Sequence, residues 1–248
     1  MIDPTLFAEP QALDRVQHRT TRLKLGGIRY DRTAGMNAIF ITAVEFGDVC
    51  RDYPIIFVDA GKADDGQREV APMAVLGLAQ GENLMLGDDG GWGARYTPAL
   101  LRAYPMGVVR VDDTHYAVCI DAKAGALSAD EGERLFDDAG EPTLFLSERR
   151  QFVEEIEREA QRTRLFGRRL LELELLRSMR FDATLPEGDK LSVDGFLAVD
   201  EDKLSALPEA TVAELHRNGM LALLNAHQIS LGLMRMLVER RVARRATA

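Results

Sequence analysis

The sequence predicts an α+β fold, with a mainly antiparallel sheet in the N-terminal part and a helical C-terminal part that includes one long helix. Short β-rich segments follow one another closely over residues 20–125, and they do not form regular βαβ units. Two of these segments have the spacing of a hairpin. After Gly140-Glu141-Pro142 the apolar residues change to a helical spacing.

The expected strands of the first half are short apolar segments bounded by turn residues. We expect strands over 38–44, 53–58, 70–78 and 83–86, with a short helix or turn over 45–52 and a tight turn over 87–91. Pro54 belongs at the start of its strand, because proline cannot donate within a ladder. Pro72 limits how centrally the start of its strand can lie.

The predicted hairpin lies further along the chain. Segments 106–111 and 115–120 flank the polar loop 112–114, and Pro98 to Tyr104 before them predicts a short helix. The sheet could form a barrel or a sandwich.

The long helix is expected from Ser147, as its cap, to about Arg180. Its charged middle, 157–164, separates two apolar ends, which is typical of a helix that crosses between contacts or pairs with another chain. Leu185-Pro186-Glu187-Gly188 breaks it, 191–199 suggests a hairpin or an edge strand, and Asp200 and Pro208 begin further helices. The last helix is expected over 226–243. We predict one domain, with a β-rich part at 1–145 and a helical part at 146–248 that packs on it.

Composition narrows the function classes. The chain has 248 residues, and its net charge of −9 makes it a poor partner for nucleic acid. Its two cysteines, Cys50 and Cys119, fit a reducing compartment. Without a signal sequence or a stretch of about 20 apolar residues, we expect a cytoplasmic protein with no membrane span. We interpret the basic run from Arg235 to Arg245 as a solvated tail that complements a helix dipole.

One segment stands out as a candidate ligand site. Aromatic rings and guanidinium groups come close together in sequence there, and such groups suit stacking and bidentate recognition of a carboxylate or a sugar. The candidate residues are Trp92, Arg95, Tyr96, Arg102 and Tyr104. The alternative is that the aromatic rings belong to the core.

Metal and catalytic sites are less well supported. His115, Cys119 and Asp121 share one strand face, but at about 3.3 Å per residue they spread too far for one ion. His216 and His227 have no serine or cysteine nucleophile in a recognisable setting. We therefore predict no metal, no cofactor and no catalytic residue, and leave open an enzyme with an unrecognised site.

The order of several motifs resembles that of the bacterial SapC family. The stretch from Trp92 to Pro105 is similar to its tryptophan, Tyr-x-Pro-Ala, arginine and Tyr-Pro pattern. Tyr53-Pro54, Cys119-Ile120-Asp121, and Leu135-Phe136 with Gly140 resemble further family motifs. The resemblance covers about residues 35–240, with departures at Ala103 and Met106. It implies an association with a bacterial surface layer or peptide transport, and it carries over no catalytic residue.

Three function hypotheses remain. An accessory protein that binds a protein partner or forms a homodimer would use apolar surface on 148–180 or 226–243. A small-molecule binder would use a pocket near Trp92, Arg95 and Tyr96. An enzyme would need convergent polar groups from distant parts of the chain. The sequence favours the first two, which are non-catalytic.

Overall fold

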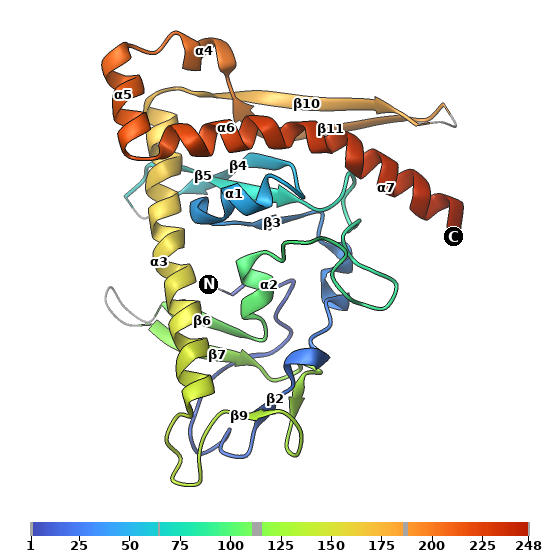
Figure 1. Cartoon of the computed structure of the whole chain (residues 1–248), viewed down its shortest axis with the longest axis vertical. Coiled ribbons are helices and arrows are strands. Elements are labelled where there is room, and N and C mark those ends of the chain that lie inside the picture. Colours follow the sequence, from blue (N-terminus) through green and yellow to red (C-terminus); the bar gives the residue numbers. More distant parts are fainter. Residues whose placement is uncertain (1, 64, 111–115, 186–187, 248) are drawn as a thin grey trace. The chain divides into compact units, whose positions relative to one another are not determined.

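The computed structural model describes residues 2–63, 65–110, 116–185 and 188–247 (Figure 1). The chain divides into two compact units. Unit 1 comprises residues 1–34, 86–92 and 99–158, and unit 2 comprises residues 35–85, 93–98 and 159–248. The long helix α3 (Leu144–Glu172) contributes its first half to unit 1 and its second half to unit 2.

The strands of the described residues belong to three antiparallel sheets. Their bounds are β1 (Pro10–Ala12), β2 (Arg22–Leu23), β3 (Ala38–Phe40), β4 (Ile55–Lys62), β5 (Arg68–Val75), β6 (Met106–Arg110), β7 (Tyr116–Asp121), β8 (Leu127–Ser128), β9 (Glu133–Arg134), β10 (Leu176–Thr184) and β11 (Lys190–Val199). The other helices are α1 (Phe46–Val49), α2 (Ala99–Ala103), α4 (Glu201–Ser205), α5 (Glu209–Arg217), α6 (Met220–Ser230) and α7 (Met234–Thr247). Short 3-10 turns in the described part of the chain are η1 (Leu25–Gly27), η2 (Asp31–Gly35), η3 (Ala43–Glu45) and η4 (Leu231–Leu233).

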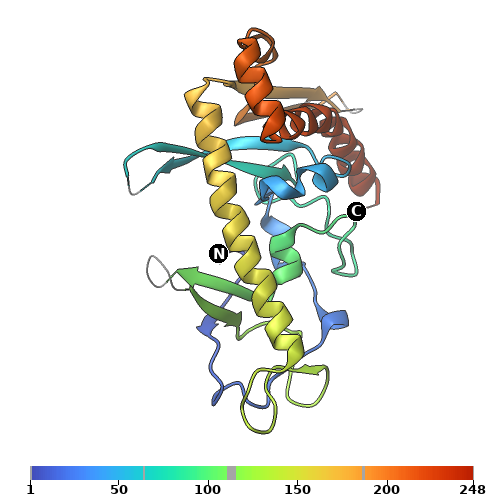
Figure 2. The same ribbon diagram turned by 60° about the vertical axis from the view of Figure 1, so that its left-hand side comes forward.

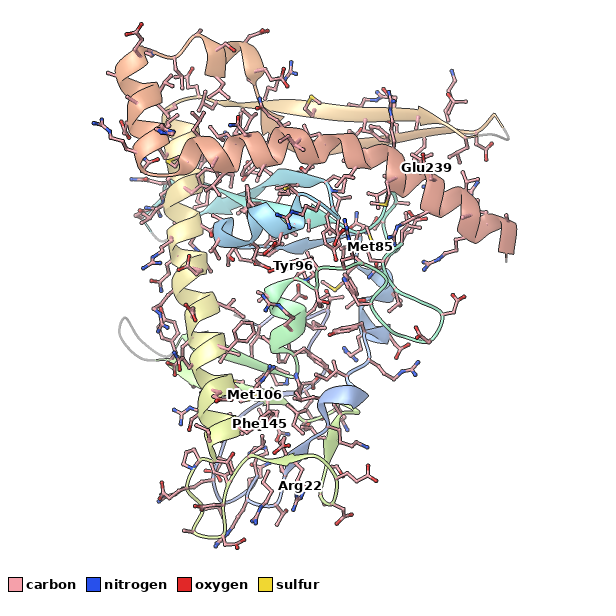
Figure 3. The ribbon with its side chains drawn as sticks, in the orientation of Figure 1. Arg22, Met85, Tyr96, Met106, Phe145 and Glu239 are labelled. Atoms are coloured by element: carbon pink, nitrogen blue, oxygen red, sulfur yellow. The ribbon has the colours of Figure 1, made fainter. Side chains whose placement is uncertain are left out.

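Unit 1 holds two small sheets, with strand orders β1-β7-β6 and β8-β2-β9. Their apolar faces, α2 and the first half of α3 enclose one hydrophobic core. Met106 of β6, which is 1% exposed, is part of this core, and Phe145 of α3 packs against the core (both labelled in Figure 3). This core fixes α2 against α3, because Ala99, Ala103 and Val153 all lie within it.

Unit 2 is built on a five-stranded sheet with strand order β10-β11-β4-β5-β3. The two long hairpins, β4–β5 and β10–β11, meet at the pair Leu197 and Phe57 and then diverge, so that their turns point to opposite sides in Figures 1 and 2. Helix α6 runs along the β10–β11 hairpin, and α7 follows it through η4 and slopes away from the hairpin (Figure 1).

Aromatic rings from four elements form the centre of unit 2. Phe46 of α1, Phe57 of β4 and Phe166 of α3 have ring centroids 5.9–6.4 Å apart. The imidazole of His227, on α6, lies 5.1 Å from the ring of Phe57. Tilted and edge-on rings at these distances interact favourably, so the cluster holds the helices to the sheet.

His227 also enters the sheet itself. Its Nε2 accepts from the backbone N–H of Val199 on β11 at 3.1 Å, and its Nδ1 donates to the carbonyl of Ile55 on β4 at 2.8 Å. In the register set by Leu197 and Phe57, Val199 stands opposite Ile55. The imidazole therefore bridges two backbone groups that would otherwise pair directly. Ser230 Oγ accepts from the N–H of Ile55 at 2.8 Å and fixes the same turn of α6 to β4.

The predicted α+β class is confirmed, with antiparallel sheets and a long helix. The expected strand at 53–58, the helices at 45–52 and 98–104, and the hairpin of 106–111 with 115–120 are also present, although residues 111–115 lie outside the described residues. Asp200 caps α4 through its side chain, as expected. The division at residue 145 stays a prediction.

The long helix was predicted with the wrong ends. It begins at Leu144, where Thr143 Oγ1 accepts from the N–H of Leu146 at 3.2 Å, so Ser147 does not cap it. It ends at Glu172 rather than near Arg180, and residues 176–184 form strand β10. Eight residue pairs with β11 outweigh the local helical pattern there, because strand pairing depends on a partner that is distant in sequence.

Other strand predictions also need correction. Residues 191–199 are the inner strand β11, and the edge strand is β10. Residues 83–86 contain only a bridge between Leu86 and Trp92. The last helical segment begins at Met220, not at residue 226.

Pro72 lies in β5, between two neighbouring strands. Its carbonyl accepts from Ile41 just beyond the last β3–β5 pair, Phe40 with Met73. A residue's N and O point to the same side of a strand, so the missing donor faces the end of that ladder and costs no hydrogen bond to β4.

The basic C-terminal run does more than the sequence indicated. Arg240 donates to the carbonyls of Leu84 and Gly93 at 3.3 and 3.2 Å, and Arg244 donates to the carbonyl of Asn83 at 2.6 Å. These arginines hold the backbone at residues 83, 84 and 93 against α7. The interpretation as a solvated tail is therefore wrong for Arg240 and Arg244. Glu239, on the same helix, is exposed (Figure 3).

Candidate functional site

The structure assigns the five candidate residues to two units. Trp92, Arg102 and Tyr104 belong to unit 1, whereas Arg95 and Tyr96 belong to unit 2. Each group is therefore described with its own neighbours.

Tyr104 is a core residue of unit 1. It is 4% exposed, its ring meets Phe7 edge-on at 5.5 Å, and its hydroxyl donates to Asp121 at 2.9 Å. Asp121 is fully buried and also accepts from the N–H groups of Ala8 and Glu9. Burial favours a raised pKa for Asp121, but these hydrogen bonds to the carboxylate outweigh it and lower the pKa below its ordinary value. The Tyr104–Asp121 pair joins the N-terminal segment to β7. The role of Tyr104 is therefore structural.

Tyr96 has a corresponding place in unit 2 and is labelled in Figure 3. Its hydroxyl donates to Glu45 at 3.0 Å, its N–H donates to Asp52 at 2.8 Å, and its carbonyl accepts from the hydroxyl of Tyr53. Arg95 pairs with Asp52 at 3.1 Å, with its own side chain 82% exposed. Tyr96 is thus held at three points, which leaves Arg95 as the accessible group of this network.

The remaining two candidates lie in an arginine–aromatic cluster, which we define as Tyr30, Trp92, Arg102, Arg149 and Phe152 of unit 1. The guanidinium carbons of Arg102 and Arg149 lie 5.2 and 5.8 Å from the centroid of Phe152. Trp92 meets Tyr30 edge-on, with centroids 5.6 Å apart. Both contacts lie in the range of favourable cation–π and aromatic interactions.

Arg149 has both satisfied and unsatisfied hydrogen-bond donors. Its Nη2 donates to the carbonyls of Arg102 and Ala103 at 2.7 and 2.9 Å, and so caps α2. Its Nε is buried and has no hydrogen-bond partner among the described residues. No carboxylate of the described residues lies within ion-pair distance of it. A half-buried guanidinium without a counter-charge is costly, and it is a favourable place for an anion.

The pKa shifts of Arg149 and Tyr30 also favour an anion at this cluster. Burial lowers the pKa of Arg149, and the neighbouring positive charge of Arg102 lowers it further. For Tyr30, burial raises the pKa of the phenol, while Arg149 and Arg102 act to lower it. The phenol and the two guanidinium groups are therefore close enough to act on one another. They offer hydrogen-bond donors and positive charge beside apolar ring faces.

Sequence reasoning found Trp92 and Arg102 but missed Tyr30, Arg149 and Phe152. Arg149 and Phe152 stand three residues apart on α3, so they share one helix face. That spacing was a usable signal, whereas the approach of Tyr30 depends on the fold.

The described residues contain no group of three or more His, Cys, Asp and Glu side chains that could hold a metal. Two of the three residues proposed from the sequence to share a strand face are described. Cys119 is buried, and the carboxylate of Asp121 already accepts hydrogen bonds from backbone N–H groups. His115 lies outside the described residues. His227 is committed to the sheet, as described above.

One segment of unit 2 meets a membrane criterion. The helical segment Met220–Ala246, 27 residues, is long and apolar enough to cross a bilayer by length and composition, and 28% of its most apolar stretch is buried. From the sequence we expected no membrane-spanning segment. Core helices of soluble proteins can meet the same criterion, and the contacts of His227 and Ser230 show that this one packs on β4 and β11.

The fold and the cluster define an α+β protein with a candidate anion-binding surface. The model of the SapC family matches residues 13–237, nearly the whole chain, and the chain belongs to that family. No curated protein and no solved structure matches it. The quoted family motifs include both hydrogen-bonded pairs described above, Tyr53 with Tyr96 and Tyr104 with Asp121.

Proposed function

We propose that this SapC-family chain is a non-catalytic binding protein that takes a carboxylate group at the arginine–aromatic cluster. The observation that carries the proposal is Arg149, a half-buried guanidinium beside a second guanidinium, with no carboxylate of the described residues to neutralise it. A bound carboxylate would supply that charge. Charge-assisted hydrogen bonds of this kind are about twice as strong as neutral ones.

The chemistry favours a carboxylate that carries an apolar group. A planar guanidinium matches the two oxygens of a carboxylate, and the rings of Phe152, Tyr30 and Trp92 offer faces for an attached side chain. A peptide C-terminus and a small aromatic acid both have this chemistry. The association with peptide transport that the resemblance implies supports the peptide as the source.

The accessory role and the cytoplasmic location expected from the sequence are part of the same proposal. A protein partner could present its own C-terminal carboxylate to the cluster, and no catalytic step is needed. The net charge of −9 disfavours other anionic partners such as nucleic acid.

Isothermal calorimetry of the full chain tests the proposal. The ligands are a tripeptide that ends in phenylalanine with a free carboxylate, the same tripeptide with a C-terminal amide, and benzoate. We expect the acid to bind at least about tenfold more tightly than the amide, because hydrogen bonds to a charged group contribute about 1.5–3 kcal/mol. Binding of the peptide acid but not of benzoate would identify a peptide as the source.

Two variants locate the binding. Arg102→Gln removes one guanidinium and keeps the carbonyl that Arg149 caps, so the fold of α2 is retained. Arg158→Gln, an exposed position on the same helix as Arg149, is the matched control. The proposal predicts weaker binding for Arg102→Gln and unchanged binding for Arg158→Gln. Equal binding of acid and amide, or no binding of any of the three ligands, would refute it.

A further inference from the structure

Strand β10 is an open edge of the unit 2 sheet. It comprises nine residues, pairs with β11 on one side, and ends the strand order. No backbone group of residues 176–184 makes a hydrogen bond to a described residue outside the β10–β11 hairpin. The outward N–H and C=O groups of such a strand are a template for another strand.

The edge is regular enough to accept one. The hairpin contains a bulge, but the extra residue lies on β11, where Gly195 has a φ of +80°, and Arg180 alone stands opposite it on β10. Side chains of β10 therefore keep their alternation over the second half of the strand. Met179, Phe181 and Ala183 are half-buried on one face, while Arg180 and Asp182 are exposed on the other, where Arg180 donates to Asp182 of the same strand at 2.8 Å.

The side chains of β10 are complementary to those of a second copy of the same strand. In an antiparallel pair centred on Phe181, each Arg180 stands opposite the Asp182 of the other copy. On the same face Ser178 meets Thr184. On the other face Phe181 meets itself and Met179 meets Ala183. Opposite charges meet twice, and apolar residues meet apolar residues.

Neighbouring registers lack this match. Centring the pair on Arg180 places two arginines opposite each other, and centring it on Asp182 places two aspartates opposite each other, which is destabilising. Sliding one copy of β10 by a single residue along the other places the polar residues of one strand opposite the apolar residues of its partner. Natural edge strands usually carry charges that repel a second strand, whereas the Arg180–Asp182 alternation attracts its own copy.

We propose that two copies of this chain associate through β10, antiparallel about a two-fold axis at Phe181, and so join their five-stranded sheets into one continuous sheet. The same surface then serves both copies, as an isologous interface requires. The inference is independent of the carboxylate site, which lies in unit 1.

Charge reversal with complementation tests this interface. Arg180→Asp leaves aspartate at both positions 180 and 182 of β10, and Asp182→Arg leaves arginine at both. Each variant alone places like charges opposite each other at both positions. We expect the dimer dissociation constant of each variant to rise at least about tenfold over that of the unaltered chain. An equal mixture of the two variants restores both opposite-charge pairs and is expected to form heterodimers.

Sedimentation velocity of the full chain over a range of micromolar concentrations measures the association. The control is the exposed ion pair of Asp48 and Arg51, 3.7 Å apart in the same unit. Asp48→Arg and Arg51→Asp change charge by the same amounts away from β10 and should leave the dimer unchanged. A monomeric unaltered chain, a dimer that resists reversal at β10, or a mixture that stays monomeric would each overturn the proposal. The heterodimer supports it.

Discussion

The imidazole that bridges β4 and β11 should make the stability of unit 2 depend on pH. Neutral His227 accepts from Val199 through Nε2 and donates to Ile55 through Nδ1. A second proton would have to sit on Nε2, where it would face the N–H of Val199. Burial, the main cause, lowers the pKa of His227 from 6.5 to about 4, against the smaller raising effect of the Ile55 hydrogen bond.

The magnitude follows from the difference between the folded and unfolded states. The folded-state pKa is depressed, so the contribution is fully present above about pH 6.5 and is lost as the pH falls towards 4. At about 1.4 kcal/mol per pKa unit, the full loss is about 3 kcal/mol, and most of it has occurred by about pH 4.5. This is a large part of the stability of an ordinary domain.

Urea unfolding at about pH 7.5 and about pH 4.5 measures the loss. The comparison is His227→Gln, whose amide offers one acceptor and one donor but does not titrate in this range. The unaltered chain should lose about 2–3 kcal/mol more than this variant between the two pH values. His216→Gln, at an exposed position on α5, is the control and should behave like the unaltered chain. Equal losses in the unaltered chain and His227→Gln would refute the reasoning.

Two further predictions concern stability near neutral pH, measured by urea unfolding. Tyr104→Phe removes the hydroxyl that donates to the buried carboxylate of Asp121 and should cost about 1.5–3 kcal/mol, whereas a cost near zero would show that the bond does not stabilise unit 1. Gly167→Ala should destabilise the chain, because its Cβ would lie 2.6 Å from the carbonyl oxygen of Val70. Gly232→Ala, with nothing within 4 Å, should instead stabilise it by up to about 1 kcal/mol, and equal effects of the two alanines would contradict the packing of α3 on β5.

Local patterns predicted those elements of the fold whose signals are contained in short segments. The antiparallel pairing of residues 106–110 with 116–120 and the cap of Asp200 on α4 depend on neighbouring residues, and the structure confirms both. The end of α3 could not be predicted in this way. Residues 176–184 become a strand because β11, beyond the following turn, pairs with them.

The candidate site shows the same limit. Trp92 and Arg102 could be selected because aromatic and guanidinium groups cluster in one sequence segment. Tyr104 was selected by the same rule but does not belong to the cluster. Its hydroxyl donates to Asp121, because a buried hydroxyl needs a hydrogen-bond partner. Arg149 and Tyr30 join the cluster from α3 and from the N-terminal segment, and neither is close to Trp92 in sequence.

The central claim, a carboxylate site at the arginine–aromatic cluster, can be tested most directly by fluorescence. Trp92 is the only tryptophan of the chain, and it contacts Tyr30 within the cluster. The emission of Trp92 should change saturably as the tripeptide acid is added, should respond to the amide only at much higher concentration, and should lose its response in Arg102→Gln. An emission that the acid leaves unchanged, or a response that survives unaltered in Arg102→Gln, would contradict the account.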